Sequence, residues 1–110
     1  MPESSPLLRG TLDTVILRAL SFGPMHGFEI TTWLENRSGG ALAVEDGALY
    51  HALVRLERRE WIDASWGVTE NNRRARYYRL SPAGRRELKS QSAALLRYTR
   101  ALAAILGNPA

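Results

Sequence analysis

VEDGALYHALVRLERREWI, residues 44–62, has two different faces when it is wound as a helix. Four apolar residues and then an acid recur at helical spacing on one face: Leu49, Ala52, Leu53, Leu56 and Glu60. The opposite face carries a small residue, an imidazole and two guanidinium groups: Ala48, His51, Arg55 and Arg58. A helix face without carboxylates can enter the major groove of DNA. The segment therefore predicts a helix that packs on one side and reads a partner on the other.

The start of this helix carries two acids, Glu45 and Asp46. Carboxylates at a helix N-terminus favour the positive end of the helix dipole, and an acidic side chain can accept a hydrogen bond from a free backbone N–H. We therefore expect one of these two residues to cap the helix.

Length and composition limit the class of protein. The chain has 110 residues, 45% of them hydrophobic and 24% charged, which is ordinary for one small folded domain. The absence of cysteine excludes disulfides, thiolate chemistry and cysteine-bound zinc, and it fits a reducing compartment. No apolar run approaches the roughly 20 residues that span a bilayer, and the first residues do not resemble a signal peptide. We therefore expect a cytoplasmic protein that makes no membrane contact.

The positive charge is concentrated in the second half of the chain. The net charge is +4, but residues 1–60 hold six bases and eight acids, whereas residues 61–110 hold nine bases and three acids. Six arginines and no acid fall between Arg73 and Arg86. Arginine presents a planar fork of donors that suits phosphate groups and guanine edges. The clustering indicates contact with nucleic acid; a solvated basic face is the plainer alternative.

Two helices are predicted before the segment at 44–62. Apolar periodicity favours a helix over residues 11–20, which Gly23 and Pro24 end. A second helix is expected over residues 27–37. His26 lies directly before it, and we expect this imidazole to stabilise the turn between the two helices and not to bind a metal.

A hairpin and a long helix are predicted after that segment. Residues 61–66 and 75–80 have the alternation and composition of strands, and the polar residues between them favour a turn, so they predict a β-hairpin. Ser81 and Pro82 are a helix cap and a first helical residue. The helix that they start is expected to continue to about Leu106.

Three helices followed by a hairpin are the order of a winged helix-turn-helix domain, so the expected fold class is mainly α (α+β). We divide the chain into an N-terminal arm over residues 1–9, a winged-helix DNA-binding domain over 10–80 and a C-terminal dimerisation helix over 81–107. In this fold the third helix reads the groove and the hairpin, or wing, contacts the backbone. The wing residues expected at double-stranded DNA are Arg73, Arg74 and Arg76.

The last predicted helix is longer than the domain that it leaves. About 25 residues at 1.5 Å each extend nearly 38 Å. Along it runs a seam with alternating steps of four and three residues: Leu88, Ser92, Leu95, Thr99, Leu102 and Leu106. We expect the distal half to pack against a second copy and form a homodimer. Leu7 and Leu8 of the arm are expected to dock on the partner or on the domain itself.

Several motifs in the chain occur together and in the same order in one known family. They are GTLD at 10–13, GPMHGFEI at 23–30, GALYHAL at 47–53, RLE at 55–57, NRRARYY at 72–78 and LSPAGR at 80–85. On these motifs the sequence resembles the PadR family of bacterial transcriptional regulators over roughly residues 9–100. The resemblance implies a homodimeric winged-helix protein that binds operator DNA, usually as a repressor, and that a small molecule releases from DNA in many members. Because a dimer places two third helices in successive major grooves, we expect the operator to be palindromic.

The resemblance also implies where individual residues act. It places Tyr50 near the DNA backbone and the wing arginines beside the duplex. The family's third helix commonly reads GSLYPAL, and this chain has Ala48 for the serine and His51 for the proline. Both departures fall on the face expected to read DNA, together with Arg55. The operator therefore cannot be carried over from other members of the family.

A small apolar or aromatic inducer is a further implication of the resemblance. In some members with a short C-terminal region, aromatic residues of the last helix line a pore at the dimer interface that accepts flat apolar compounds. Tyr98, with Leu95 and Leu102 nearby, fits that description here. Ordinary dimer packing of the same three residues is the alternative.

The same residues bear on other classes of function. No enzyme is expected, because there is no cysteine nucleophile, no glycine-rich phosphate loop before a helix and no suitable pair of carboxylates. No cofactor or metal is expected. Single-stranded nucleic acid would need aromatic residues exposed on a sheet, and of Tyr77 and Tyr78 one is expected to face the core. A winged-helix adaptor that binds another protein without specific DNA binding stays open as the alternative.

Overall fold

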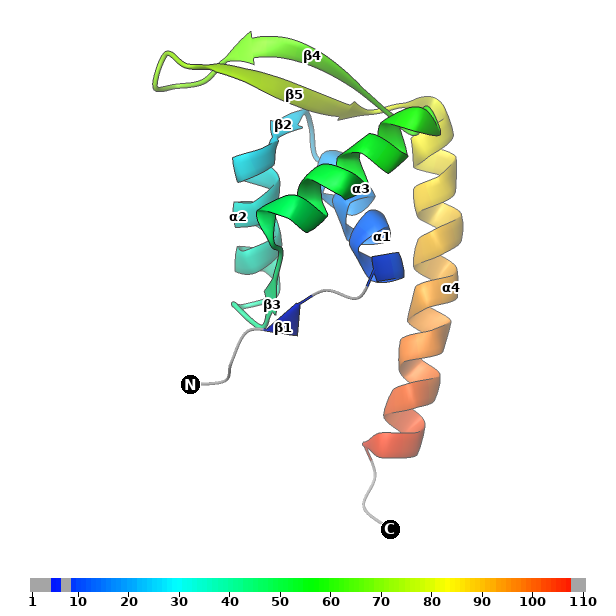
Figure 1. Ribbon diagram of the computed structural model, residues 1–110. Coiled ribbons are helices and arrows are strands. Elements are labelled where there is room, and N and C mark those ends of the chain that lie inside the picture. Colours follow the sequence, from blue (N-terminus) through cyan, green and yellow to red (C-terminus); the bar gives the residue numbers. More distant parts are fainter. Residues whose placement is uncertain (1–4, 7–8, 108–110) are drawn as a thin grey trace.

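The part of the chain that the structure describes folds into four helices, a β-hairpin and three strands of two residues each (Figure 1). The computed structural model describes residues 5–6 and 9–107. The helices are α1 (Arg9–Leu20), α2 (Gly27–Arg37), α3 (Asp46–Arg58) and α4 (Pro82–Leu106). The first three lie under the hairpin, and α4 descends along one side of them (Figure 1). The predicted winged helix-turn-helix is confirmed, whereas Leu7 and Leu8, expected to dock, lie outside the described residues.

Two small sheets connect the helices. In the first sheet, β1 (Ser5–Pro6) pairs in parallel with β3 (Leu42–Ala43). The second is antiparallel, with the order β2 (Met25–His26), β5 (Arg74–Leu80), β4 (Ile62–Val68). Strands β4 and β5 form the hairpin, which is in register from Ile62 opposite Leu80 to Val68 opposite Arg74. The short strand β2 therefore fixes the start of α2 to the base of the wing.

The core lies between the helices and the base of the hairpin. The four apolar residues that predicted the inner face of α3 are all buried, which confirms that prediction. The most deeply buried large side chains are Ile16, Leu17, Leu20, Ile30, Leu56 and Ile62. Burial of one such side chain contributes about 1.5–3 kcal/mol. The hydrophobic face of α3 thus anchors it, and its opposite face is left at the surface.

The caps of the helices explain where α2 and α4 begin. The backbone N–H of Glu29 donates to His26 Nδ1 over 3.3 Å, and the backbone N–H of His26 donates to Glu29 Oε1 over 3.1 Å. This reciprocal capping box confirms that His26 stabilises the turn before α2. At the other helix, Ser81 Oγ accepts from the backbone N–H of Gly84 over 3.0 Å, as its place before Pro82 predicted.

The start and the end of α3 differ from the expectation. Glu45 occupies the capping position, but its side chain makes no cap hydrogen bond, and Asp46 is already the first residue of the helix. The expected acidic cap is therefore wrong. The helix ends at Arg58, and Glu60 has a φ of 61°. Glu60 consequently leaves the helical stripe on which its spacing placed it.

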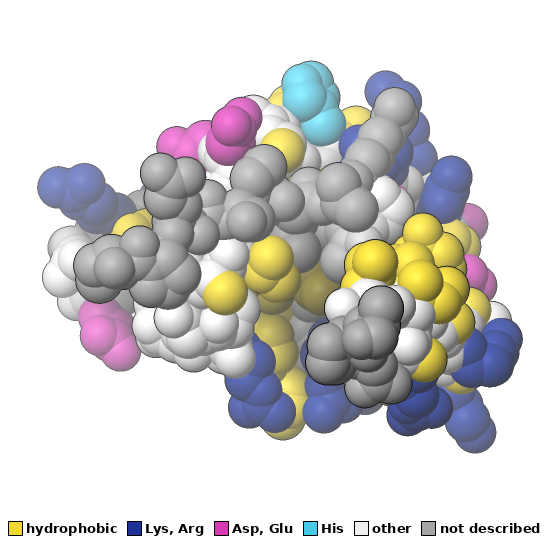
Figure 2. All heavy atoms as spheres, turned by 90° about the horizontal axis from the view of Figure 1, so that it is seen from below, with side chains coloured by type: hydrophobic (Ala, Val, Ile, Leu, Met, Phe, Trp, Pro, Cys, Tyr) yellow, Lys and Arg dark blue, Asp and Glu magenta, His cyan; other side chains and the backbone are white. Residues whose placement is uncertain are grey.

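The distal half of α4 is uncovered in the single chain. Leu88 is buried against the domain, but side chains near the helix end are exposed, such as Ile105 at 72% and Leu106 at 77%. Figure 1 shows this half extending below the other helices, and Figure 2 shows hydrophobic side chains gathered around its end. The apolar seam thus lacks a cover among the described residues. None of the described helices meets the length and apolarity that a membrane span requires.

Candidate nucleic-acid interface

The outer face of α3 carries exposed side chains, and three of them belong to residues expected at DNA from the sequence: Ala48, Tyr50 and His51. Ala48, Tyr50, His51 and Arg58 are all exposed. The rings of Tyr50 and His51 meet edge to face, with 5.8 Å between their centroids. The small side chain of Ala48 leaves the start of this face open, so a groove edge can approach the backbone there. The structure thus brings a methyl group, a phenol and an imidazole together on one accessible surface.

Arg55 does not point freely from that surface. Its Nη2 lies 2.6 Å from Asp13 Oδ1, and its Nε lies 3.4 Å from Asp13 Oδ2. The Arg55 side chain is 26% exposed and that of Asp13 is 15% exposed. The contact of Arg55 with base or phosphate stays a prediction, and the structure adds that α1 holds its guanidinium through Asp13. Helical spacing predicted the direction in which the Arg55 Cβ atom points. It could not predict the ion pair with Asp13, which lies 42 positions earlier in the chain.

The tip of the wing is a short turn at residues 69–73. The backbone N–H of Thr69 donates to the Arg73 carbonyl over 2.8 Å, and Arg73 N–H donates to Thr69 Oγ1 over 3.2 Å. Asn72 has a φ of 60°, a left-handed conformation that asparagine tolerates, and the turn predicted between the two strands is confirmed. The strands run further than predicted, because Val68 and Arg74 still pair. The hairpin therefore carries its basic tip further from the core.

The three wing arginines have different surroundings. Arg73 lies exposed at the tip, and among the described residues its guanidinium has no charged or aromatic partner. Arg74 lies over the Trp66 ring, with its Cζ 4.7 Å from the ring centroid. Arg76 Nη2 pairs with Glu57 Oε2 of α3 over 2.7 Å. Arg73 is thus the least constrained of the three, whereas Arg74 and Arg76 are held in place by neighbours.

Trp66 is a surface residue that the sequence analysis did not assign to the site. It is 63% exposed and lies opposite Arg76 in the hairpin. Because side chains alternate along a strand, it shares a face with Ile62 and Tyr78, which are buried. The wing is longer than the core beneath it, so the same face becomes a surface near the tip. The alternation of residues 62–66 indicated which face of the strand Trp66 lies on. It could not indicate that the core ends before Trp66 and leaves this side chain exposed.

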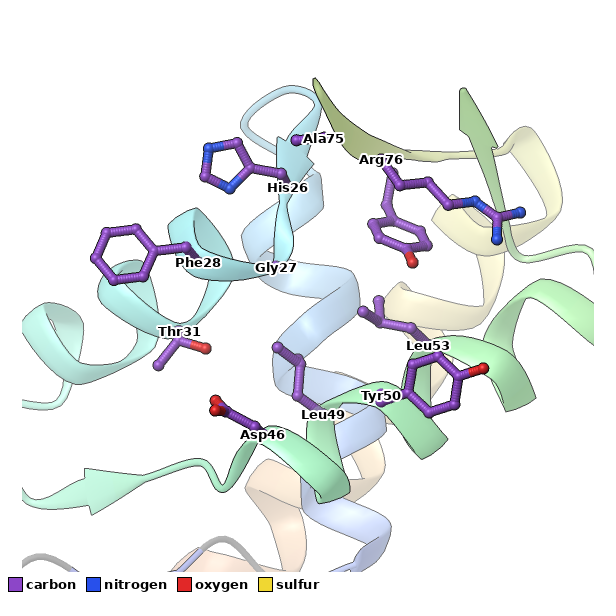
Figure 3. A pocket seen from close by; sticks show the side chains of 11 residues that line it. His26, Gly27, Phe28, Thr31, Asp46, Leu49, Tyr50, Leu53, Ala75 and Arg76 are labelled. Atoms are coloured by element: carbon purple, nitrogen blue, oxygen red, sulfur yellow. The ribbon is translucent and has the colours of Figure 1, made fainter. Parts of the chain in front are cut away.

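A groove separates the wing from the first turns of α2 and α3 (Figure 3). Its volume is about 650 Å³. It is lined by His26, Gly27, Phe28 and Thr31 from β2 and α2, by Asp46, Leu49, Tyr50 and Leu53 from α3, and by Ala75, Arg76 and Tyr78 from β5.

Burial raises the pKa of the Tyr78 phenol above its ordinary value of 10.0, and the Arg76 guanidinium opposes this rise. The phenol therefore stays neutral, and Tyr78, not Tyr77, is the tyrosine that faces the core, as one of the two was expected to do.

The residues expected at a ligand pore lie on α4, away from the groove beside the wing. Leu95, Tyr98 and Leu102 follow one another along one side of α4. Leu95 is half-buried, whereas Tyr98 and Leu102 are exposed. The structure thus brings these three residues together on α4, separately from the surface formed by α3 and the wing.

Known proteins share this sequence and architecture. The model of the transcriptional regulator PadR-like family matches residues 16–90. Uncharacterized protein X of Lysinibacillus sphaericus is 32% identical over 81 residues, which are 74% of this chain and 74% of that protein. A transcriptional regulator from Clostridium thermocellum is similar in structure, with a TM-score of 0.79 and 28% identity, over 89% of this chain and 95% of the other.

A more distant likeness is to Bacillus subtilis PadR, whose structure was solved in complex with operator DNA. It has a TM-score of 0.65 and 22% identity, over 73% of this chain and 45% of that one. This likeness supports the fold, while the family match covers more than half of the chain and includes α2, α3 and the wing. The family consists of regulators, which supports a protein that is not an enzyme. The chain belongs to the PadR-like family of transcriptional regulators.

Proposed function

We propose that this protein binds double-stranded DNA as a homodimer and represses transcription from a palindromic operator. The observation that carries the proposal is the exposed face of α3, which lies next to a wing with an exposed arginine at its tip. In a dimer, two such helices enter successive major grooves, one helical turn of DNA apart. The complex of Bacillus subtilis PadR with operator DNA supports operator DNA as the partner of a protein with this fold.

The contacts follow from the chemistry of each side chain. Ala48 offers a methyl group to the thymine methyl, and His51 offers a donor or an acceptor to a base edge. Tyr50, which lines the groove and is largely exposed, contacts backbone phosphate (Figure 3). The arginines of the wing, Arg73 and Arg74, neutralise flanking phosphates. These latter contacts give affinity but no sequence information.

Arg76 and Arg55 act differently from the freely exposed arginines. Arg76 uses one nitrogen in its contact with Glu57, so its remaining donors can reach the DNA backbone. Arg55 is occupied by Asp13 and is assigned to the orientation of α3 instead of to a base.

The double substitution Arg73→Ala and Arg74→Ala is expected to weaken binding to operator and scrambled duplexes alike. Each lost phosphate contact removes about 0.9 from the slope of log K against log salt. For two arginines in each of two wings, the slope should flatten by up to about 4. Fluorescence anisotropy across a salt series measures this change. Unchanged affinity and slope would show that the wing does not contact the duplex and would favour the adaptor alternative.

The substitution His51→Ala is expected to alter sequence preference more than total affinity. Loss of one base contact costs about 1–3 kcal/mol at the base pair that it reads. The affinity for scrambled DNA should stay within about twofold, because phosphate contacts dominate that binding. Selection of preferred sites from a random library, with wild type and variant side by side, measures the change. Identical preferred sites would remove His51 from the reading face.

The proposed dimer is formed by α4, with Leu95, Tyr98 and Leu102 at the contact between copies. The exposure of Tyr98 and Leu102 in the single chain, next to the half-buried Leu95, supports this assignment. A flat apolar or aromatic inducer would bind between the two copies of α4 at the same residues. Such a compound shifts the equilibrium only if it binds the DNA-free dimer more tightly than the DNA-bound one.

A further inference from the structure

Two consecutive residues of α1 make polar contacts with two different helices. Asp13 accepts two hydrogen bonds from the guanidinium of Arg55 on α3. Thr14 Oγ1 donates to Gln91 Oε1 on α4 over 2.8 Å. Gln91 Nε2 in turn donates to Glu87 Oε1 over 3.1 Å, which holds the amide in place. One turn of α1 therefore connects the helix proposed to read DNA with the helix proposed to join two copies.

The ion pair between Asp13 and Arg55 is better placed to fix geometry than another pair in the same chain. Asp63 Oδ1 and Arg79 Nε lie 3.6 Å apart, with side chains 66% and 65% exposed. The Asp13–Arg55 contact is bidentate, closer at 2.6 Å and largely covered. Two parallel N–H···O bonds fix both the position and the rotation of a guanidinium, and partial burial reduces screening by salt. Exposed pairs such as Asp63–Arg79 have little effect on stability.

We propose that Asp13 is a positioning residue for DNA recognition. It sets the orientation of α3 relative to α1. It also keeps the Arg55 guanidinium from contacting DNA phosphates, which are the same whatever the base sequence. Asp13 itself touches no base. The proposal rests on the proposed function, because it requires that α3 reads DNA. Selective readout depends on hydrogen-bond geometry at base edges, whereas phosphate contacts tolerate a small rotation of the helix.

The test compares Asp13→Asn with wild type on a duplex selected by the wild-type protein and on a scrambled duplex of equal length. Asparagine keeps the shape of the side chain but loses its charge. We expect the ratio of the two affinities to fall at least about tenfold, the discrimination that one base contact provides. Binding to the scrambled duplex should not weaken, because the released Arg55 can meet phosphate. Asp63→Asn makes the same change of charge at the exposed pair and should leave the ratio unchanged.

Exchange of the two residues separates positioning from a general loss of structure. The double variant Asp13→Arg and Arg55→Asp restores an ion pair and should recover selectivity relative to Asp13→Asn. A merely structural role would instead lower both affinities in proportion and lower the melting temperature. Undiminished selectivity in Asp13→Asn, or equal loss on both duplexes, would overturn the proposal. A wild-type protein that selects no duplex would contradict the proposed function itself, which is a distinguishable result.

Discussion

Replacing Leu102 with glutamate is expected to make the protein monomeric and to weaken operator binding by about 10²–10⁴-fold. In a two-fold dimer the substitution enters twice, and each carboxylate would be buried against an apolar seam without a partner. A dimer binds two half-sites at once, and this linkage commonly raises the affinity by about 10²–10⁴-fold. Loss of the dimer removes that gain in affinity. Sedimentation velocity measures the oligomeric state, and fluorescence anisotropy on a selected duplex measures the binding.

The substitution should leave the domain folded, because Leu102 lies outside the hydrophobic core of the single chain. The matched control is Ala104→Glu, which adds the same charge two positions along α4 on a different side of the helix. This control should remain dimeric and bind normally. If Leu102→Glu stayed dimeric and bound its operator as tightly as wild type, the interface between copies would lie elsewhere.

Replacing Gly84 with alanine is expected to lower the free energy of unfolding by about 3 kcal/mol, the upper end of the range for overpacking. Gly84 is buried in the first turn of α4. A Cβ atom there would lie 2.0 Å from the Trp61 carbonyl oxygen and 2.9 Å from Leu80 Cδ1. The same carbonyl accepts the backbone N–H of Ser81 over 3.0 Å, so the carbonyl and the start of α4 cannot separate without losing that bond. Urea denaturation followed by circular dichroism measures the change.

Gly10→Ala provides the control for a glycine in a helix. Gly10 lies in α1, and a Cβ atom there meets nothing within 4 Å. Alanine is favoured over glycine in helices by roughly 0.5–1 kcal/mol, so this variant should be as stable as wild type or more so. A Gly84→Ala variant with wild-type stability would mean that α4 does not pack against the Trp61 backbone as closely as described.

Local chemistry made much of the fold predictable. The limits of α2 and α4 follow from residues next to them, such as the Ser81 cap and Pro82, and the structure confirms both helices. The buried face of α3 followed from spacing alone, since a four-residue apolar stripe has to find a core. Glu45 shows the limit of this reasoning, because a side chain suited to capping made no cap bond.

The surroundings of the site residues could not be predicted in the same way. Helical spacing placed Arg55 on the reading face, but its ion pair depends on how α1 crosses α3. The pairing of Arg76 with Glu57 likewise depends on the position of the wing above α3. The first strand was predicted to end at residue 66, yet Gly67 lies within β4, where an added Cβ atom would lie 2.8 Å from the Tyr77 ring. Contacts between elements were therefore decided by packing and not by local pattern.

The most direct measurement is a salt-titrated equilibrium binding of the purified protein to two duplexes of equal length. One is the DNA upstream of its own gene, and the other is a scrambled version of the same sequence. We predict tight and selective binding to the first, with a slope of log K against log salt near −4 or steeper for two wings that each neutralise at least two phosphates. Equal and weak binding to both duplexes, with a shallow slope, would contradict the account of α3 and the wing as a DNA-reading surface.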